Sequence, residues 1–445
     1  MQAYAAAIAG NLGMLSIGLF FGWASPSLSK LQSEDSPVKL NLAQYSWIVS
    51  LFTFGALAGS VISSFIINVI GRKKTMLAST IPSIIGWLMI AFATTASEFY
   101  ISRFISGISA GISYSVTPIY LGEISPAKQR GLFTSILTVA AKLGAILEYS
   151  MGPFLSVQKL ALVSLIAPIL FAATFVWLPE SPYQLIRSMK HREAIDSLIK
   201  LRGKQDIFDE FDLIHKSVNE DLTNGTGFKE LFCVPGNRKA MIIILGLLFC
   251  QQFGGSQVII NYAQSIFDAA NIGFEGKYLT IILGVIQLTF TIICSATIDR
   301  GGRRLLLVSS LIGTGVATGI IGAYFYCQKL GLSSAIEWMP AIGVIMYVVT
   351  YAFGIAVIPF TLMGELFPTN VKALGNTVIM SCCNIFSFGI IKSYQDIVDA
   401  FGIYISFWIF TFFNFIGAIF SFFYVPETKG RTLQDIQNEL RGRKV

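Results

Sequence analysis

Twelve long apolar windows run through this chain of 445 residues, and each is about the length of a membrane-spanning helix. Such a helix needs about 20 mostly apolar residues. Only 13% of the residues are charged, against about 25% in ordinary soluble domains. The windows cover residues 6–29, 45–67, 75–94, 99–121, 132–153, 160–178, 240–265, 277–298, 305–327, 339–363, 373–391 and 403–425. The chain is therefore predicted to be an all-α integral membrane protein with twelve transmembrane helices.

The one long polar stretch, about 180–239, divides the windows six and six. This predicts an N-terminal six-helix bundle (1–179), a cytoplasmic linker (180–239), a C-terminal six-helix bundle (240–425) and a C-terminal tail (426–445). Apolar residues recur at helical spacing in the linker, which predicts two or three short amphipathic helices. These residues are Leu185, Met189, Ile195, Leu198, Phe208, Phe211, Ile214 and Val218. Since the first window begins close to Met1, we expect that a native amino-terminal tail has been trimmed.

Basic residues that flank the windows set the expected orientation. With both termini and the linker on one side, that side carries 24 of the 32 lysines and arginines. Both termini are therefore predicted to be cytoplasmic, and the net charge of +7 is mostly a topology signal. A nucleic-acid partner would need basic residues gathered on a soluble face, whereas the linker mixes them with acids. We expect the chain to lie in a lipid bilayer and to bind no nucleic acid.

Three short motifs occur twice, in the same order and at matching window ends. The pairs are Gly71-Arg72-Lys73 with Gly302-Arg303-Arg304, Glu123 seven residues before Arg130 with Glu365 seven before Lys372, and Pro179-Glu180-Ser181 with Pro426-Glu427-Thr428. One such match is weak, but three in register indicate a duplication. Two parallel six-helix halves are the signature of one large transporter architecture, which holds its substrate near the bilayer midplane.

The charged members of the repeat are expected to pair across the cytoplasmic helix ends. They are Arg72, Glu123 and Arg130 in the first half, and Arg303, Glu365 and Lys372 in the second. Such a network would latch the cytoplasmic side while the outer side is open, and would break as the protein turns inward. The alternative is that the basic residues only anchor the topology, but anchoring needs no acids at matched spacing.

Buried amides in the seventh window need partners. The stretch FCQQFGGSQVIINY carries Gln251, Gln252, Gln257 and Asn261, and an unpaired amide in an apolar medium costs roughly 2–7 kcal/mol. Hydrogen bonds between helices are one answer. A polar substrate such as a sugar is the other, because amides offer both donors and acceptors. For Asn261 the two readings stay equally open. Gly254 and Gly255 predict a break in the helix.

Eight motifs together resemble the sugar porters of the major facilitator superfamily, over essentially the whole chain. They are GRKK (71–74), RFISG (103–107), PIYLGEISPAKQRG (118–131), PESP (179–182), QQFGG (251–255), DRGGRR (299–304), PFTLMGE (359–365) and PETKGRTL (426–433). GWASPSL (22–28), PESPYQL and LEYSMGP (147–153) further resemble insect facilitated trehalose transporters. Asp299 keeps the family's acid before the second basic motif and is expected to join the ion-pair network, whereas Asn68 replaces it in the first.

The resemblance implies facilitative transport of a sugar, trehalose or a hexose, across the plasma membrane. It also implies a monomer with no cofactor and no metal. Gln251 and Gln252 match the family's sugar-binding glutamine pair directly. At other sugar-contacting positions the family's residues are replaced by Gln257, Tyr149, Gln287, Phe360, Cys383 and Asn384. All but Cys383 keep hydrogen-bonding or aromatic character, so a polyol pocket is still expected.

Transport coupled to protons needs an ionisable group in the pathway. Proton-coupled members of the family carry an acid in the first helix, and this chain has none there, which favours passive transport. Lys142 and Glu148 lie in the fifth window. Glu148 has two readings: it pairs with a charge such as Arg103, or it makes the protein a proton-coupled symporter.

Two other classes of function are weighed against transport. A non-transporting sugar sensor on the same fold would signal through cytosolic segments, but such sensors carry long tails and this tail has about 20 residues. A membrane enzyme is disfavoured, because the windows hold no histidine, no Cys–His arrangement and no metal-ligand spacing.

Overall fold

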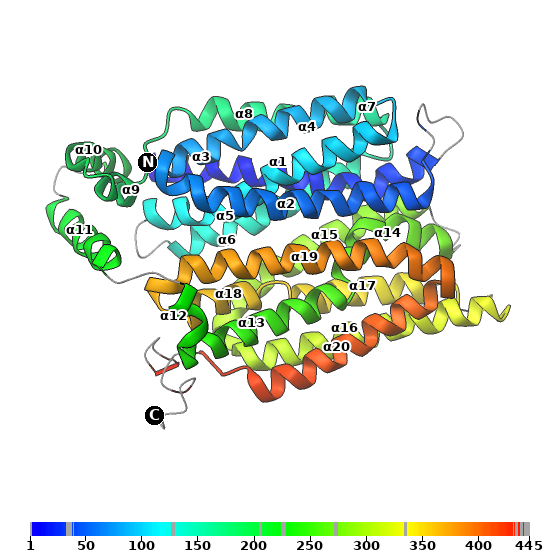
Figure 1. The fold of residues 1–445 in the computed structure, drawn as a ribbon. Coiled ribbons are helices and arrows are strands. Elements are labelled where there is room, and N and C mark those ends of the chain that lie inside the picture. The colour runs from blue at the N-terminus through cyan, green and yellow to red at the C-terminus, as the bar shows by residue number, and fades with distance from the viewer. Residues whose placement is uncertain are drawn as a thin grey trace. The chain divides into compact units, whose positions relative to one another are not determined.

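All twelve predicted windows lie on helices, or on two consecutive helices, of the protein (Figure 1). The structure, a computed structural model, describes residues 2–32, 38, 40–125, 130–203, 207–223, 228–270, 275–332, 336–429, 431, 435, 436 and 439. These residues form no strand. Within them, 10 helical segments are long and apolar enough to cross a membrane, and Met339–Ala352 is a shorter apolar helix. The all-α membrane fold is therefore confirmed.

Consecutive helices follow one another with few connecting residues. The helices before the linker are α1 (Gln2–Gln32), α2 (Leu42–Ile70), α3 (Arg72–Ala78), α4 (Thr80–Phe92), α5 (Ala96–Ile124), α6 (Arg130–Met151), α7 (Val157–Ser164) and α8 (Ile166–Phe175). The linker contains α9 (Pro182–Arg187), α10 (His191–Arg202), α11 (Phe208–Thr223) and α12 (Phe228–Cys233). The remaining helices are α13 (Pro235–Phe253), α14 (Ser256–Ala270), α15 (Gly276–Gly301), α16 (Arg303–Lys329), α17 (Met339–Ala352), α18 (Ile358–Leu366), α19 (Thr369–Phe401) and α20 (Ile403–Tyr424). The seventh window is interrupted between α13 and α14, and the tenth between α17 and α18. The candidate site described below lies at these interruptions.

The helices gather into two compact units. Unit 1 comprises Met1–Phe21, Leu51–Ala145 and Leu155–Thr226. Unit 2 comprises Gly22–Ser50, Ile146–Phe154 and Gly227–Val445. Unit 2 thus includes the second part of α1, the start of α2 and the end of α6. The bundle bounds expected from the sequence, 1–179 and 240–425, stay a prediction.

Glycine pairs bring α2 and α5 of unit 1 into backbone contact. A Cβ atom on Gly55 would lie 2.1 Å from a backbone oxygen of α5, and one on Gly107 would lie 2.1 Å from a backbone oxygen of α2. Gly59 and Gly111 repeat the contact one turn further on. Helix association in lipid depends on close packing, which small residues four apart allow. These glycines therefore hold the core of unit 1 together.

In unit 2, α16 lies along both α17 and α20 (Figure 1). The hydroxyl oxygens of Thr318 and Thr411 lie 3.0 Å apart and link α16 to α20. The rings of Phe325 and Phe407 are stacked between the same two helices, with centroids 6.0 Å apart. Hydrogen bonds between helices and tight apolar packing are the two forces that join helices in a bilayer.

The linker folds into four short helices rather than two or three, and α9, α10 and α11 enclose a small apolar core. Its buried members are Leu185, Ile186, Ala194, Leu198, Ile207, Ile214 and Val218, with Ile195 and Phe211 partly buried. The prediction was wrong for Met189 and Phe208, whose side chains are 76% and 67% exposed. Met189 follows the end of α9 with a φ of 61° and so leaves the helical face. Ile207, just before α11, is buried in this core instead of Phe208.

Candidate functional site

The seventh window breaks at Gly254 and Gly255, between α13 and α14. Gly255 has a φ of 92°, a left-handed conformation that glycine adopts without a steric cost. The hydroxyl of Tyr347 and the side-chain amide of Asn414 each donate to the carbonyl oxygen of Gly254 at 3.1 Å. The predicted helix break is confirmed, and side chains of α17 and α20 hold it.

The last turn of α13 presents Gln251 and Gln252 beside this break, and both side chains are buried. Nε2 of Gln252 lies 3.3 Å from Oε1 of Gln251 and 3.2 Å from Sγ of Cys383. Oε1 of Gln252 accepts a hydrogen bond of 2.9 Å from Ser387. Nε2 of Gln251 donates to the carbonyl oxygen of Ile355 at 2.6 Å. Three of the predicted site residues, Gln251, Gln252 and Cys383, are thus brought together.

Two more amides follow on α14. The side-chain nitrogen of Asn261 donates to the carbonyl oxygen of Gln257 at 2.7 Å, inside its own helix. Among the described residues, Oε1 of Gln257 is buried and has no hydrogen-bond partner. A buried acceptor without a partner costs about 1–3 kcal/mol. Gln257 is therefore available to accept a hydrogen bond from a ligand, whereas Asn261 is engaged locally.

Tyr149, near the end of α6, is buried against α14 and α15. Its hydroxyl donates to the carbonyl oxygen of Ile260 at 3.4 Å. A Cβ atom on Gly284 would lie 3.0 Å from the Tyr149 ring, so the ring packs directly on the backbone of α15. Gln287 follows one turn along α15 and is also buried. Tyr149 and Gln287 thus belong to the same unit as the glutamine pair.

Phe360 and Asn384 are less closely engaged. Phe360 lies in the first turn of α18 with 41% of its side chain exposed. Asn384 follows Cys383 on α19 and is half-buried. No hydrogen bond joins either residue to Gln251 or Gln252 in the described part of the chain. Their predicted roles in sugar binding stay predictions.

A row of aromatic rings joins α2, α14 and α19 within unit 2. The ring centroids of Tyr45 and Tyr262 lie 6.0 Å apart, and those of Tyr262 and Tyr394 lie 5.1 Å apart. The hydroxyl of Tyr45 donates to the carbonyl oxygen of Ala24 on α1. In the predicted topology these three residues lie in the outward-facing half of their spans.

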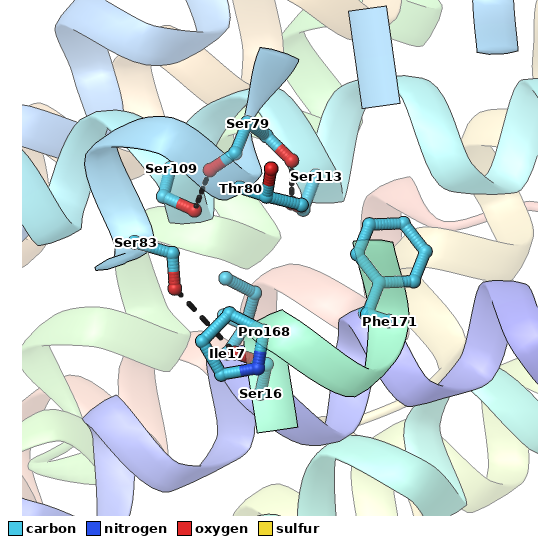
Figure 2. Close-up of a pocket in the computed structure, with 10 residues that line it drawn as sticks. Ser16, Ile17, Ser79, Thr80, Ser83, Ser109, Ser113, Pro168 and Phe171 are labelled. Carbon is cyan, nitrogen blue, oxygen red and sulfur yellow. Dashed lines mark hydrogen bonds between the residues drawn. The ribbon is translucent and has the colours of Figure 1, made fainter. Parts of the chain in front are cut away.

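A small cavity lies in unit 1 among serine side chains of α1, α4 and α5 (Figure 2). The hydroxyls of Ser16 and Ser83 lie 3.5 Å apart across it, and that of Ser109 donates to the backbone of Ser79 at 2.7 Å. Its volume of about 10 Å³ is that of roughly one water-sized sphere. It is too small for a sugar ring.

The charged repeat forms a compact cluster in unit 1. Nε of Arg72 donates to both carboxylate oxygens of Glu123, at 3.2 and 3.1 Å. Glu123 also accepts from the Ser181 hydroxyl, and Arg72 donates to the side-chain oxygen of Gln184. Glu180 accepts from the backbone amide of Lys73 at the start of α3, at 3.0 Å. The Pro-Glu-Ser motif therefore closes onto both the ion pair and a helix N-terminus, where a carboxylate is favoured.

Unit 2 repeats this geometry. Arg303 donates to Glu365 at 2.9 Å, and Glu365 accepts from the Thr428 hydroxyl at 2.5 Å. Glu427 accepts from the backbone amides of Arg303 and Arg304, at 3.0 and 3.1 Å. Burial raises the pKa of Glu427, but four backbone N–H bonds outweigh it and hold that pKa below its ordinary value. The sequence repeat is thus a repeat of the same hydrogen-bonding pattern.

The other predicted members of the network are placed less fully. The side chains of Arg130 and Asp299 lie outside the described residues. Nζ of Lys372 donates to the carbonyl oxygen of Gly364 at 2.9 Å. Lys372 therefore contacts the residue that directly precedes Glu365.

Three charged residues lie well inside the predicted spans, away from their ends. Arg103 on α5 is buried, donates to the carbonyl oxygen of Phe20 at 3.1 Å and lies 4.3 Å from the centre of the Phe52 ring. A guanidinium over an aromatic face is stabilised by the charge distribution of the ring. Glu148 on α6 is fully buried and Lys142 is half-buried.

Ser387 and Asn414 are among the residues at the site that the sequence analysis did not name. Ser387 lies four residues after Cys383 and so shares its helix face. Asn414 is a lone amide in the aromatic stretch FWIFTFFNFIGAIF, where the desolvation argument made for Gln251 applies equally. Both signals were present, but only the fold shows which helix each side chain meets.

Comparison with known proteins gives one consistent result. A family model described as "Sugar (and other) transporter" matches residues 3–440. Over 441 residues the chain is 32% identical to the facilitated trehalose transporter Tret1 of Apis mellifera ligustica, covering 98% of this chain and 88% of that relative. Over 444 residues it is 31% identical to Tret1 of Drosophila mojavensis, covering 98% and 51%. The chain spans about half the length of the Drosophila relatives.

Solved structures share the fold. The proton:xylose symporter XylE bound to 6-bromo-6-deoxy-D-glucose superposes with a TM-score of 0.79 at 23% identity, covering 99% of both chains. The inward-open xylose transporter XylE from E. coli gives a TM-score of 0.81 at 21% identity, covering 98% of this chain and 99% of that one. At these low sequence identities, the structural similarity establishes the fold alone.

Proposed function

Because the chain belongs to the sugar transporter family, we propose that it moves a sugar across the plasma membrane by facilitated diffusion with alternating access. The proposed substrate is trehalose or a hexose, as the curated relatives named for trehalose suggest. The observation that carries the proposal is the buried glutamine pair, Gln251 and Gln252, fixed beside the helix break at Gly254 and Gly255.

The glutamine pair keeps capacity for a ligand. Each primary amide offers two N–H donors and two acceptor lone pairs. One donor of Gln252 is directed at Cys383, and a thioether or thiol sulfur is only a weak acceptor. A sugar oxygen would therefore be a better partner than the sulfur. The unpartnered oxygen of Gln257 adds an acceptor for a sugar hydroxyl.

The aromatic members of the proposed site suit the apolar face of a sugar ring. The hydroxyl of Tyr149 donates to the carbonyl oxygen of Ile260, and Phe360 is 41% exposed. Gln287, Cys383 and Asn384 complete the proposed contacts. A carrier must release its load, and millimolar binding corresponds to only about −4 kcal/mol, which a few such hydrogen bonds supply.

Passive transport is supported by the first predicted span, 6–29, which carries no acidic residue. Proton coupling would need an ionisable group in the pathway. Glu148, which is fully buried on α6, is the group that the alternative symporter would use.

Alternating access is assigned to the charged clusters and the aromatic row. The two ion-pair clusters, at Glu123 and Glu365, are proposed to latch the cytoplasmic side. The row of Tyr45, Tyr262 and Tyr394 is proposed to close the outer side. The cytoplasmic side would then open when the ion-pair clusters break, and the outer side would open when the three aromatic rings separate.

Counterflow in liposomes tests the proposal. We expect preloaded trehalose or glucose to drive saturable uptake of the same labelled sugar, with equal rates at pH 5.5 and 7.5 and no accumulation when a proton gradient is imposed. Accumulation driven by protons and lost in Glu148→Gln would replace the facilitator with a symporter. No counterflow with any sugar would point to a sensor instead.

A further inference from the structure

The helix interruption at Phe353–Val357 lies between α17 and α18, and Pro359 follows it in the first turn of α18. Pro359 has no N–H to donate to the carbonyl oxygen of Ile355, four residues earlier, so that carbonyl needs another partner. Backbone bonds bridge part of the gap, since the amide of Ala356 donates to Tyr351 and that of Ile358 donates to Gly354, both at 3.0 Å. The N–H and the carbonyl oxygen of Ile355 need partners from elsewhere in the chain.

Side chains from two other helices satisfy the backbone of Ile355. Its N–H donates to the hydroxyl oxygen of Ser310 on α16 at 3.0 Å. Its carbonyl oxygen accepts from Nε2 of Gln251 on α13 at 2.6 Å. Ile355 is 1% exposed, and an unsatisfied backbone group in lipid costs several kcal/mol. The interruption therefore depends on these two side chains.

Ser310 bridges the interruption. Its hydroxyl accepts from Ile355 and donates to the carbonyl oxygen of Thr350, on the α17 side, at 2.7 Å. Gly354 allows the approach, because a Cβ atom there would lie 2.5 Å from Cβ of Ser310 and 2.5 Å from a backbone oxygen of α16. The Ile355 peptide is thus pressed against α16 and held there by one hydroxyl.

We propose that Ser310 is a positioning residue for sugar binding, because it fixes the Ile355 carbonyl that in turn orients the side-chain amide of Gln251. The proposal rests on the sugar transport proposed above. An amide can present either its N–H₂ or its oxygen to a given point. The Ile355 carbonyl accepts only the N–H₂ end. One donor of Gln251 is thereby committed, and the orientation of its oxygen is set.

The consequence for transport is specific. Without the Ser310 hydroxyl, the Ile355 carbonyl loses its fixed position and the Gln251 amide loses its preferred orientation. Sugar affinity should fall, while the rate of the conformational change need not. Ser310 contacts no sugar in this scheme and acts only through Ile355 and Gln251.

The test is saturable counterflow of labelled trehalose and glucose in liposomes holding the full chain. For Ser310→Ala we expect KM to rise roughly three- to ten-fold, the effect of one lost hydrogen bond, with the maximal rate within about two-fold. Ser309→Ala is the matched control, because the neighbouring hydroxyl is exposed and, among the described residues, bonds within its own helix to Leu306 at 3.1 Å. Its KM should equal that of the wild type.

A double-mutant comparison separates positioning from general packing. If Ser310 acts through Gln251, then Ser310→Ala should not raise KM further in a Gln251→Ala background. Should Ser310→Ala fail to fold, Ser310→Cys keeps nearly the same volume with a weaker donor and acceptor, and its KM should exceed that of the wild type.

The outcomes are distinct. An unchanged KM in Ser310→Ala, or an additive rise in the Gln251→Ala background, overturns the positioning role while leaving sugar transport intact. Absence of counterflow in the wild type overturns sugar transport and this inference together.

Discussion

Glu123 on α5 holds Arg72 at the start of α3 through both carboxylate oxygens, and both side chains are largely buried. Arg303 and Glu365 repeat the pair in unit 2 at 2.9 Å. In each unit a Pro-Glu-Ser/Thr motif completes the cluster with one hydroxyl and one carboxylate. The duplication of the chain is therefore visible at the level of single hydrogen bonds.

Glu123→Gln and Glu365→Gln should each weaken a cluster. In each variant the arginine loses a charge-assisted hydrogen bond to its carboxylate, a contact that contributes roughly 1.5–3 kcal/mol. If the clusters latch the cytoplasmic side, each variant should shift the population toward inward-facing forms. Labelling of introduced cysteines from the cytoplasmic side should then speed up.

The control for this experiment is Glu193→Gln, which removes the exposed ion pair with Lys190. Exposed pairs contribute about 0–1 kcal/mol, so the labelling rate should not change. Equal labelling in Glu123→Gln, Glu365→Gln and the wild type would contradict the latch.

Glu427 predicts a dependence of stability on pH. Its pKa is lowered in the folded protein, so its stabilising effect is complete above its ordinary value of 4.5 and is lost as the pH falls through the lower, folded value. The wild type should lose more thermal stability than Glu427→Gln between pH 6 and pH 4. Glu439→Gln, which loses an exposed pair with Arg431, should follow the wild-type curve. Parallel melting curves for all three proteins would contradict the backbone-bonded carboxylate.

The contact between α2 and α5 predicts a sharp difference between glycines of one helix. In Gly107→Ala the new methyl group would meet a backbone oxygen of α2 at 2.1 Å, so the helices must separate, which costs about 1–3 kcal/mol. In Gly122→Ala, also on α5, nothing lies within 4 Å. Melting of the purified protein should show a clear loss for the first variant and no loss for the second. Equal stability of the two would rule out the backbone contact.

Ser387→Ala removes the hydroxyl that donates to Gln252. Since one hydrogen bond contributes about 0.5–1.5 kcal/mol, the KM for sugar should rise roughly three-fold or more. Cys382→Ser, next to Cys383 but half-buried and outside this hydrogen-bonded group, should leave KM unchanged. A KM in Ser387→Ala equal to that of Cys382→Ser would remove Ser387 from the site.

Much of the fold could be predicted from hydropathy, because lipid requires long apolar helices. The break at Gly254 and Gly255 could be predicted because glycine marks it locally. The hydrogen-bond partners of Ile355 in the interruption at Phe353–Val357 could not be predicted, since Ser310 and Gln251 lie far away in the chain. Amphipathic helices were predicted in the linker, but Met189 and Phe208 lie outside their shared apolar core.

The site was predicted in part, where its residues carry a local signal in the sequence. Gln251, Gln252 and Cys383 carry a signal in the sequence and meet in the structure. Ser387 and Asn414 are isolated polar residues in apolar stretches. Their partners are determined by the packing of α19 and α20 against α13. Residue type indicates that a partner is needed, whereas tertiary packing decides which one.

In the proposed mechanism, the side-chain amide of Gln252 binds the transported sugar. Saturable counterflow of labelled trehalose and glucose should be compared in the wild type, Gln252→Ala and Gln395→Ala, the last removing a buried glutamine that bonds to Asp399 within α19. We predict saturable counterflow in the wild type and Gln395→Ala, and at least a ten-fold loss in kcat/KM, about 1.4 kcal/mol, in Gln252→Ala. Wild-type counterflow that persists unchanged in Gln252→Ala would contradict the proposed site.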